Sequence, residues 1–462
     1  MARRVASRTE AHVQYRWAGA GAIGVLCGAS AALTAWGPRQ HPLVTLGVAV
    51  GSVVAVMVLL GLEAADRPLG RSVRCGAMVA VSGLLVFAVV TPPRGSRDVW
   101  MYATYGRMIE HRHVSPYVTT PAQILAQDRR AGRPRDAILG LSAPQWRRVG
   151  SVYGPAFLGV SALWMRIAGP SPLLARLGFQ GLAAVAVIFC LALLHRRRAP
   201  PAGIVLVGCH PLVVAWVVNG GHADAAIGAL LLVCVVCAER GRIGVAAVAG
   251  GLAAGIKATA GLGVLGLIVW VWRRHGWRRA FIAALTAGAV VGGPLVVAGG
   301  TEALRPLLAA RTYASRSTPW QFLSWVIGRP AVPGPWVFGL IVLVGLGLAL
   351  LAVRGARQVD EAVAAPLVAF VLLAPYALPW YGFWALPALA GALRSLLSRA
   401  MFAIATWQVF TYAYVPRRPG WTNATFHAMA LGMGGFEALV IGLVLVTGFV
   451  RPGRPRPEEF QG

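Results

Sequence analysis

The feature that most constrains this chain is a series of apolar runs that recurs from Trp17 to Val450. A helix needs about 20 residues to cross the roughly 30 Å hydrocarbon core of a bilayer, and most of these runs are of about that length. Hydrophobic residues make up 57% of the chain and charged residues only 13%, too few polar side chains to cover a water-soluble globule. The sequence therefore predicts an all-α polytopic membrane protein, with residues 1–462 forming a single integral membrane domain.

The formal charge of +28 would suggest nucleic acid in a soluble protein, but here the arginines stand in short clusters between apolar runs. We interpret these clusters as topology signals and as contacts with anionic membrane lipids, and we expect no nucleic-acid partner. The first apolar run follows a basic stretch, 1–16, and lacks a cleavage site, which predicts an uncleaved signal anchor. The 43 basic residues include a single lysine, Lys257.

The arginine clusters also predict which segments lie outside, because basic loops favour the cytoplasm. With the N-terminus inside, the third span leads outward and places the longest polar stretch, 92–152, in an external loop. The next apolar run, Pro155–Ala168, has about 21 Å of helix, which is short for a crossing. If it crossed, Arg196–Arg198 would lie outside, so we expect 155–168 to lie in the interface or to re-enter.

The remaining runs alternate regularly, which gives about fourteen spans with both termini in the cytoplasm and a disordered tail, 451–462. Later outer loops are expected at 300–335, Pro379–Gly382 and Pro416–His427. The predicted spans are Ala18–Trp36, Leu43–Leu62, Cys75–Thr91, Leu173–Leu194, Ile204–Asn219, Ala225–Ala238, Val245–Ile256, Leu262–Trp272, Phe281–Gly299, Trp336–Val353, Val363–Leu378, Phe383–Leu393, Met401–Val415 and Met429–Val450.

Two carboxylates stand at span ends, where a helical bundle can hold them rigidly. Asp98 begins the aromatic and arginine-rich external loop, and Asp224 lies at an outer turn between two spans. An interfacial acid can also simply pair with a neighbouring arginine, but the position of Asp98 favours a functional role. This topology places six of the 15 carboxylates outside: Asp98, Glu110, Asp128, Asp136, Asp224 and Glu302.

Lys257 is predicted at the outward tip of a hairpin of two short apolar arms. A charge at that depth is costly without a partner, so an intramembrane ionisable residue is a functional hypothesis by default. The functional interpretation is a counter-ion for a lipid phosphate, and the alternative is an ammonium that snorkels to the headgroups. Cys234 and Cys237 have metal-like spacing but no histidine or second cysteine pair nearby, so no metal site is indicated.

The external carboxylates and cations limit the chemistry that this chain can perform. No glycine loop for a nucleotide is visible, and nucleotide sugars are confined to the cytoplasm, so an external transferase must take its sugar from a lipid phosphate. A phosphate leaving group needs cations and no general acid, whereas the acceptor hydroxyl needs a base. One carboxylate with arginine and lysine therefore suffices, unlike glycoside hydrolysis, which uses two carboxylates.

Several motifs between about residues 90 and 390 resemble the GT-C superfamily, and most closely the actinobacterial polyprenyl-phosphomannose-dependent α-1,6-mannosyltransferases. Two positions depart from the pattern: Ala223 stands where Asn is expected, and Ser115 where Asp or Asn is expected. The motifs are Asp98-Val99-Trp100-Met101-Tyr102, Tyr105-Gly106-Arg107-Met108, Ser115-Pro116-Tyr117, Tyr153-Gly154-Pro155, Gly220-Gly221-His222-Ala223-Asp224-Ala225, Gly255-Ile256-Lys257-Ala258-Thr259 and Leu378-Pro379-Trp380-Tyr381-Gly382-Phe383-Trp384-Ala385-Leu386-Pro387.

The resemblance implies a GT-C-like helical bundle in a bacterial plasma membrane, with its active site on the extracytoplasmic side. The implied partners are a polyprenyl-phosphate sugar donor and a cell-envelope glycan or glycolipid acceptor. No cofactor is indicated, although some relatives in the superfamily need a divalent ion. The implied roles are Asp98 as the base of an inverting transfer, Lys257 and Arg107 on the phosphate, Asp224 and His222 on sugar hydroxyls, and Tyr102 and Tyr153 in the substrate site.

The sequence leaves two alternatives open. One keeps the enzyme class and changes the sugar or linkage, as in an arabinofuranosyl or α-1,2-mannosyl transferase. The other is a transporter or flippase of lipid-linked glycans. Transporters commonly contain paired repeats, whereas this chain has one external loop near its start that is far larger than the rest.

Overall fold

A computed structural model describes residues 2–37, 42–67, 69–310 and 358–413, together with the single residues 315 and 347. The regular structure of these residues is entirely helical, which confirms the predicted all-α class. The expected span 429–450, the outer loop 416–427 and the tail 451–462 lie outside the described residues, as do all of the expected span 336–353 except residue 347 and most of the expected loop 300–335.

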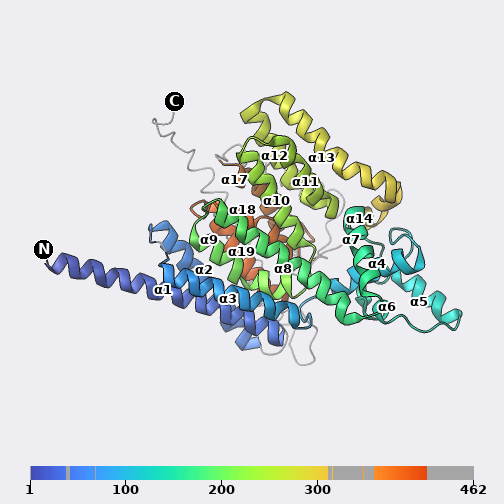
Figure 1. The fold of residues 1–462 in the computed structure, drawn as a ribbon, viewed down its shortest axis with the longest axis horizontal. Coiled ribbons are helices and arrows are strands. Elements are labelled where there is room, and N and C mark those ends of the chain that lie inside the picture. The colour runs from blue at the N-terminus through green and yellow to red at the C-terminus, as the bar shows by residue number, and fades with distance from the viewer. Residues whose placement is uncertain are drawn as a thin grey trace, which may run out of the picture.

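Five helices in the described ranges are long and apolar enough to cross a membrane, and they match predicted spans. In Figure 1, α1, α2 and α3 pack along one flank and α13 lies on the opposite flank, with α8 between them. The five helices are α1 (Ala2–Trp36), α2 (Pro42–Ala64), α3 (Arg71–Val90), α8 (Pro172–Arg196) and α13 (Trp277–Ala298).

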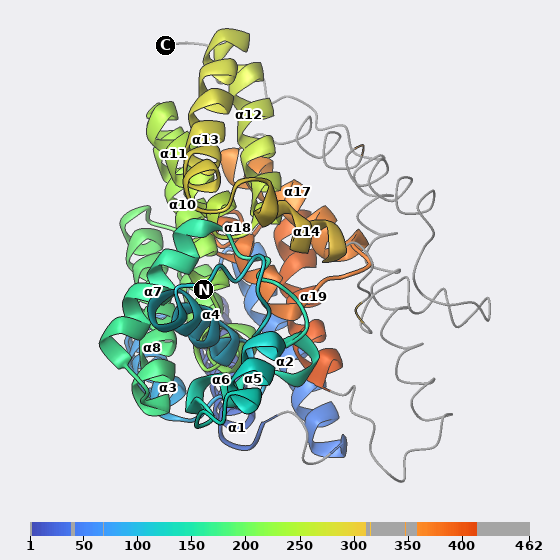
Figure 2. The same cartoon turned by 90° about the vertical axis from the view of Figure 1, so that its right-hand side faces the viewer.

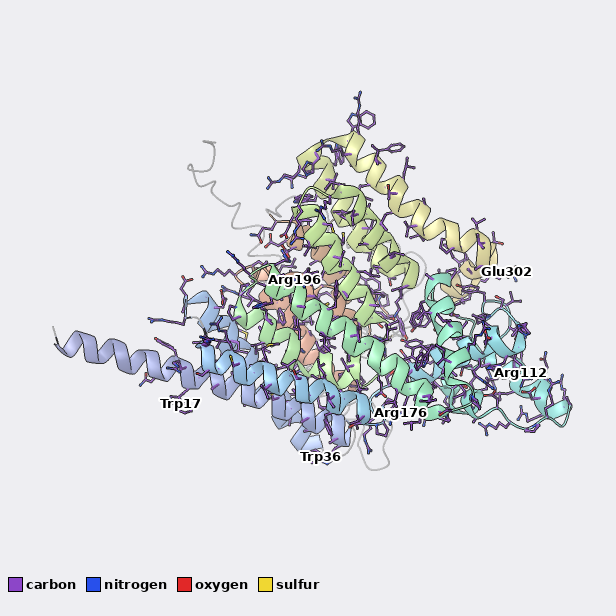
Figure 3. All side chains as sticks on the ribbon, in the orientation of Figure 1. Trp17, Trp36, Arg112, Arg176, Arg196 and Glu302 are labelled. Carbon is purple, nitrogen blue, oxygen red and sulfur yellow. The ribbon has the colours of Figure 1, made fainter. Side chains whose placement is uncertain are left out.

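Two exposed tryptophans mark the apolar length of α1. Trp17 is 73% exposed and Trp36 is 61% exposed, and Figure 3 shows both on the outer flank of the molecule. At 1.5 Å per residue, the two positions lie about 29 Å apart along the helix, close to the thickness of a bilayer core. Tryptophan is enriched at both membrane interfaces, so these side chains fit the two ends of a transmembrane crossing.

The predicted span Ile204–Asn219 is a broken element, whose two parts together are long and apolar enough to cross a membrane. An α-helix, α9 (Pro201–Cys209), and a π-helix, η2 (Leu212–Val218), meet at an angle of 45°. The break falls at His210, whose ψ is 131°, because the residue before a proline is forced out of helical conformation. The backbone N–H of Leu212, just after the break, donates a hydrogen bond to Nδ1 of His210 at 3.1 Å.

The predicted hairpin that carries Lys257 is confirmed. It consists of α11 (Ile243–Ile256), a 3₁₀ turn η3 (Ala258–Ala260) and α12 (Gly261–His275), and it follows α10 (Asp224–Glu239). Lys257 itself has extended backbone between α11 and η3. The hairpin packs against α10 and α13, so the position of its tip is fixed by neighbouring helices on two sides.

The predicted external loop is folded, and it gathers at one end of the molecule (Figure 1). It contains α4 (Asp98–Arg112), α5 (Pro121–Arg130), α6 (Ala137–Leu141) and the 3₁₀ turn η1 (Pro144–Trp146). The following helix, α7 (Pro155–Ala168), packs along α4. With 14 residues, α7 is an apolar helix below the length of a span.

The last described elements line the centre of the molecule, as the orange segments of Figure 2 show. They are α17 (Val359–Leu373), the 3₁₀ helix η5 (Pro379–Trp384), α18 (Leu386–Leu389) and α19 (Leu396–Ala413). The predicted span Phe383–Leu393 was therefore wrong, because this stretch is the end of a buried 3₁₀ helix and a four-residue helix. Residues Pro379–Gly382 belong to the same 3₁₀ helix, and their position on the outer side stays a prediction.

The described residues hold up to six spans by length and composition if the bent α9–η2 pair counts as one. Shorter apolar helices such as α10, α11, α12 and α17 pack among the long ones. The predicted total of about fourteen spans therefore stays a prediction.

The close packing of α4 on α7 yields a first prediction. A Cβ added to Gly106 would lie 2.3 Å from the carbonyl oxygen of Ser161, whereas one added to Gly159 on α7 would meet open space. We expect Gly106→Ala to lower the free energy of unfolding by about 2 kcal/mol, because overpacking forces the helices apart. The matched Gly159→Ala change should be neutral or stabilising. Thermal unfolding of both variants in one detergent checks this, and equal midpoints would contradict close contact between α4 and α7.

Candidate active site

A cavity of about 530 Å³ opens between the start of α4, the hairpin tip and η5. Its size is within the range of small-molecule sites, and such sites combine apolar walls with a few polar groups. Its charged lining residues are Arg94, Arg97, Asp98 and Lys257. Its aromatic walls are formed by Tyr105, Trp146, Tyr153, Phe370, Tyr376, Trp380 and Tyr381.

Asp98 is the first residue of α4, and its side chain is 17% exposed. The start of a helix favours a negative charge, and the backbone N–H of Asp98 donates to the Ser96 hydroxyl at 3.1 Å. Among the described residues, Asp98 has no arginine or lysine ion pair within 4.0 Å, unlike the other acids expected outside. Those acids pair as Glu110–Arg166, Asp128–Arg112, Asp136–Arg107, Asp224–Lys257 and Glu302–Arg305.

The segment that leads into Asp98 is anchored by side chains that sequence reasoning missed. The last carbonyls of α3 lack intrahelical partners and need external donors. Asn219 donates to the carbonyls of Ala88 and Thr91 at 3.0 and 2.9 Å, and Gln180 donates to the same two carbonyls. The amide of Gln180 also donates to the carbonyl of Asn219 at 2.8 Å, so α3, α8 and η2 are tied together.

Lys257 enters the cavity from the hairpin tip, and only 9% of its side chain is exposed. Its Nζ lies 3.5 Å from Oδ1 of Asp224 and 4.0 Å from the ring centroid of Tyr381. Trp384 Nε1 donates to the same Asp224 oxygen at 2.8 Å. The ammonium is therefore held by a buried carboxylate and an aromatic face, and it does not extend away from the protein toward lipid headgroups.

His222 joins the two halves of the site. Its Nδ1 lies 3.5 Å from Oδ2 of Asp98 and 3.8 Å from Oδ2 of Asp224, and its ring stacks on Trp380 with centroids 4.1 Å apart. A continuous series of contacts thus links Asp98 to Lys257 through His222 and Asp224. His222 and Asp224 are fully buried behind the cavity wall and do not line it, so their expected contact with sugar hydroxyls finds no support in this geometry.

Tyr102 and Tyr153 both lie beside this series. The Tyr102 hydroxyl is 3.3 Å from that of Tyr153 and 3.5 Å from Nδ1 of His222, and Tyr153 lines the cavity. The backbone N–H of Gly154 donates to the carbonyl of Ile256 at 2.9 Å. A Cβ on Gly154 would lie 1.8 Å from the carbonyl oxygen of Gly255, so a glycine is required where the loop meets the hairpin tip.

Arg107, predicted to bind phosphate, is not brought into the cavity. Its Nε and Nη2 donate to Oδ2 of Asp136 at 3.0 and 2.5 Å. Asp136 also caps α6 by accepting from the backbone N–H of Ile138 at 2.9 Å. Arg107 therefore fastens α4 to α6. The arginines that line the cavity are Arg94 and Arg97, which sequence reasoning did not single out.

The protonation of Asp98 is shifted by its surroundings. Burial raises the pKa of this carboxyl to about 6; the Lys257 ammonium opposes the rise, and the Asp224 carboxylate adds to it. Asp98 is therefore ionised at neutral pH yet basic enough to accept a proton near that pH. A base is most useful when its pKa lies near the working pH.

Membrane helices and a cavity that combines one carboxylate with several cations fit a membrane glycosyltransferase of the predicted kind. Residues 16–274 match the family described as "Alpha-(1->6)-mannopyranosyltransferase, N-terminal domain". The chain is also 27% identical over 413 residues to alpha-(1->6)-mannopyranosyltransferase A of Mycobacterium tuberculosis (strain ATCC 25618 / H37Rv), across 80% of this chain and 76% of that protein. No solved structure matches the chain.

The chain therefore belongs to the alpha-(1->6)-mannopyranosyltransferase family and is an α-mannosyltransferase. This confirms the family and the enzyme class that the motifs indicated. It also separates the chain from the transporter alternative, because a group-transfer enzyme is the class to which the relative belongs.

The buried Lys257–Asp224 pair yields a second prediction. Asp224→Asn removes the charge partner of a buried ammonium, and breaking one side of a buried pair costs about 3 to 5 kcal/mol. Asp66→Asn is the matched control, because Asp66 is 71% exposed where it pairs with Arg394, and exposed pairs contribute at most about 1 kcal/mol. Thermal unfolding should show a large loss for the first variant and almost none for the second; similar small losses would show that Lys257 does not depend on Asp224.

Proposed function

We propose that the chain transfers a mannosyl group from a polyprenyl-phosphate donor to a hydroxyl of a cell-envelope glycan or glycolipid, at the outer face of a bacterial plasma membrane. The observation that carries this proposal is the shared cavity, which both Asp98 and Lys257 line. Transfer from a phosphate-linked sugar requires a base for the acceptor hydroxyl and a cation for the leaving phosphate, and a carboxylate and an ammonium can supply these two functions.

In the proposed reaction, Asp98 accepts the proton of the acceptor hydroxyl as its oxygen attacks the anomeric carbon. The bond between that carbon and the phosphate oxygen breaks, and polyprenyl phosphate leaves with the electron pair. Attack opposite the leaving group inverts the configuration, so a β-linked donor gives an α-linked product. The leaving phosphate has low basicity and therefore needs no general acid.

Stabilisation of the departing phosphate is assigned to Lys257 with Arg94 and Arg97, which replace Arg107 in this role. Neither arginine forms an ion pair with another described residue, and both line the cavity. Guanidinium groups bind phosphate oxygens in a bidentate manner. The proposal gives Asp224 the role of holding Lys257 and gives His222 and Tyr102 the role of orienting Asp98, since these three lie behind the wall.

An outward-facing site is supported by the charges at the two ends of α8. Its last turn and the residues after it carry Arg196, Arg197 and Arg198, and Figure 3 places Arg196 away from the end of the molecule that holds Arg112 and Glu302. The basic end of α8 fits the cytoplasm, so the end that holds α4 and the cavity fits the outside. In this proposal, the described helices form part of a GT-C-like bundle of about fourteen spans.

Mannose and an α-1,6 linkage are proposed from the name of the family and of the mycobacterial relative. The family sets arabinofuranosyl transfer aside, whereas α-1,2-mannosyl transfer remains an alternative because Ala223 and Ser115 depart from the expected pattern. Incubation of a membrane preparation with labelled polyprenyl-phosphomannose distinguishes the two linkages: the proposal expects an α-1,6-specific mannosidase to release the transferred label.

The assignment of Asp98 as base predicts the effect of Asp98→Asn. The amide cannot accept the proton, so we expect kcat to fall about 10³-fold, within the range that general bases contribute. Glu110→Gln is the matched control, because Glu110 lies on the same helix, pairs with Arg166 and does not line the cavity. Transfer of labelled mannose by both purified variants tests the assignment, and wild-type activity of Asp98→Asn would refute it.

The raised pKa of Asp98 predicts the pH profile. Below about pH 6 the carboxyl is protonated in the free enzyme and cannot act as a base, so kcat/KM should fall tenfold for each pH unit. Above that value kcat/KM should reach a plateau. A profile that stays flat down to pH 4.5, measured with an enzyme shown to remain folded there, would exclude a base with this pKa.

A further inference from the structure

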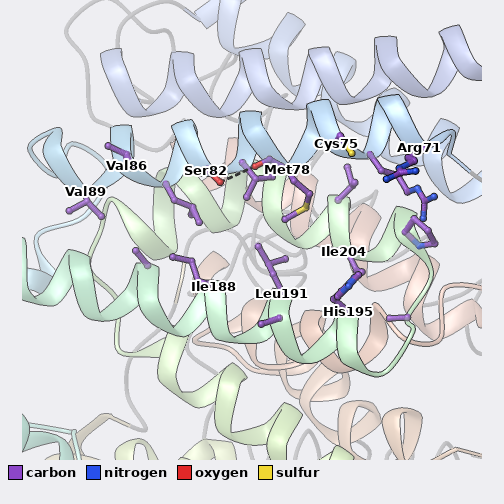
Figure 4. Close-up of a pocket in the computed structure, with 18 of the residues that line it drawn as sticks. Arg71, Cys75, Met78, Ser82, Val86, Val89, Ile188, Leu191, His195 and Ile204 are labelled. Carbon is purple, nitrogen blue, oxygen red and sulfur yellow. Dashed lines mark hydrogen bonds between the residues drawn. The ribbon is translucent and has the colours of Figure 1, made fainter.

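A second, larger cavity lies apart from the active site. It is a groove of about 1290 Å³ between α3, α8 and the start of α9, and none of its lining residues lines the active-site cavity (Figure 4). Nothing in the proposed transfer reaction uses it. One end of the groove is apolar and the other is basic, and this difference indicates what kind of molecule the groove can bind.

Most of the groove is apolar. Its floor consists of buried side chains, including Val81 and Leu85 of α3 and Leu191 of α8, and Figure 4 shows Val86, Val89 and Ile188 toward the end of the groove away from Arg71. Alanines on α8 leave the space open. From Arg71 to Val89 the groove follows α3 for about 27 Å at 1.5 Å per residue, enough for a long hydrocarbon chain.

The other end of the groove is basic. Arg71 and Arg74 at the start of α3 line it together with His195 and Arg198 at the end of α8. All four side chains are exposed, and none is in an ion pair with another described residue. No aspartate or glutamate among the described residues lines the groove. Unpaired cations at the mouth of an apolar channel leave a positive charge that an anionic headgroup would neutralise.

We propose that this groove binds one anionic phospholipid, with its phosphate on Arg71, Arg74 and Arg198 and an acyl chain along α3 and α8. Basic pockets between membrane helices bind anionic headgroups, and guanidinium groups match phosphate oxygens. A neutral phospholipid would fill the apolar length but would leave the charge at the mouth uncompensated. The occupant is therefore distinguished by its net charge.

This lipid is distinct from the sugar donor of the transfer reaction. The basic mouth lies at the first turn of α3, whereas the active site follows the last turn of the same helix, so the two phosphates would be separated by about the length of α3. In the predicted topology, the mouth faces the cytoplasmic leaflet, where a resident lipid would brace α3 against α8. The inference goes beyond the proposed function and stands whichever sugar is transferred.

Native mass spectrometry of the purified full-length protein tests the inference with dioleoylphosphatidylglycerol and dioleoylphosphatidylcholine as probes. We expect phosphatidylglycerol to be retained preferentially, and we expect Arg71→Ala/Arg74→Ala/Arg198→Ala to weaken its binding at least about tenfold. The matched control is Arg240→Ala/Arg242→Ala, which removes two arginines at the turn between α10 and α11 that do not line the groove. This control should bind as the wild type does.

A second variant keeps every charge and fills the channel instead. Ala192→Trp places a large side chain in the groove, so it should also weaken retention of phosphatidylglycerol while the thermal unfolding midpoint stays near that of the wild type. Equal retention of the two lipids by the wild type, equal loss in the arginine control, or retention of polyprenyl phosphate in preference to phosphatidylglycerol through the same arginines would each overturn the inference.

Discussion

The active site depends on one buried ion pair between Lys257 and Asp224. An ammonium at the tip of a membrane hairpin is costly unless a carboxylate and further contacts compensate for lost water. Asp224 supplies the charge, Trp384 fixes one carboxylate oxygen, and Tyr381 covers the ammonium. Because these partners come from α10 and η5, the pair also determines where the hairpin tip stands relative to the centre of the bundle.

Asp98 is brought near this ion pair by the folded segment that was predicted to be external. Asp98 stands at the start of α4, and His222 lies between it and the ion pair. The Gly154–Ile256 backbone hydrogen bond joins the segment to the hairpin where a side chain on Gly154 would collide. The base, Asp98 on α4, and the cation, Lys257 at the hairpin tip, are thus held close to each other by contacts behind the cavity wall. The wall itself therefore stays available for substrate.

Much of this arrangement could be predicted from the sequence, and the predictions that were wrong have physical explanations. Apolar length located the long helices, and single charges at span ends located Asp98 and Lys257. Periodicity could not reveal the break at His210, or the 3₁₀ helix that replaces a span at 383–393, because both are decided by prolines and tertiary burial. Arg107 was predicted to bind phosphate as an arginine of the external loop within a motif of the family, whereas its partner Asp136 becomes a neighbour only after α6 packs on α4.

The proposed mechanism requires that the base, Asp98, and the cation that binds the phosphate, Lys257, line one cavity. A structure with a non-transferable phosphonate analogue of polyprenyl-phosphomannose tests this requirement most directly. We expect the phosphonate against Lys257 and the anomeric carbon within reach of an acceptor oxygen bound to Asp98. A phosphonate bound elsewhere, such as between α3 and α8, or an anomeric carbon turned away from Asp98, would contradict this claim.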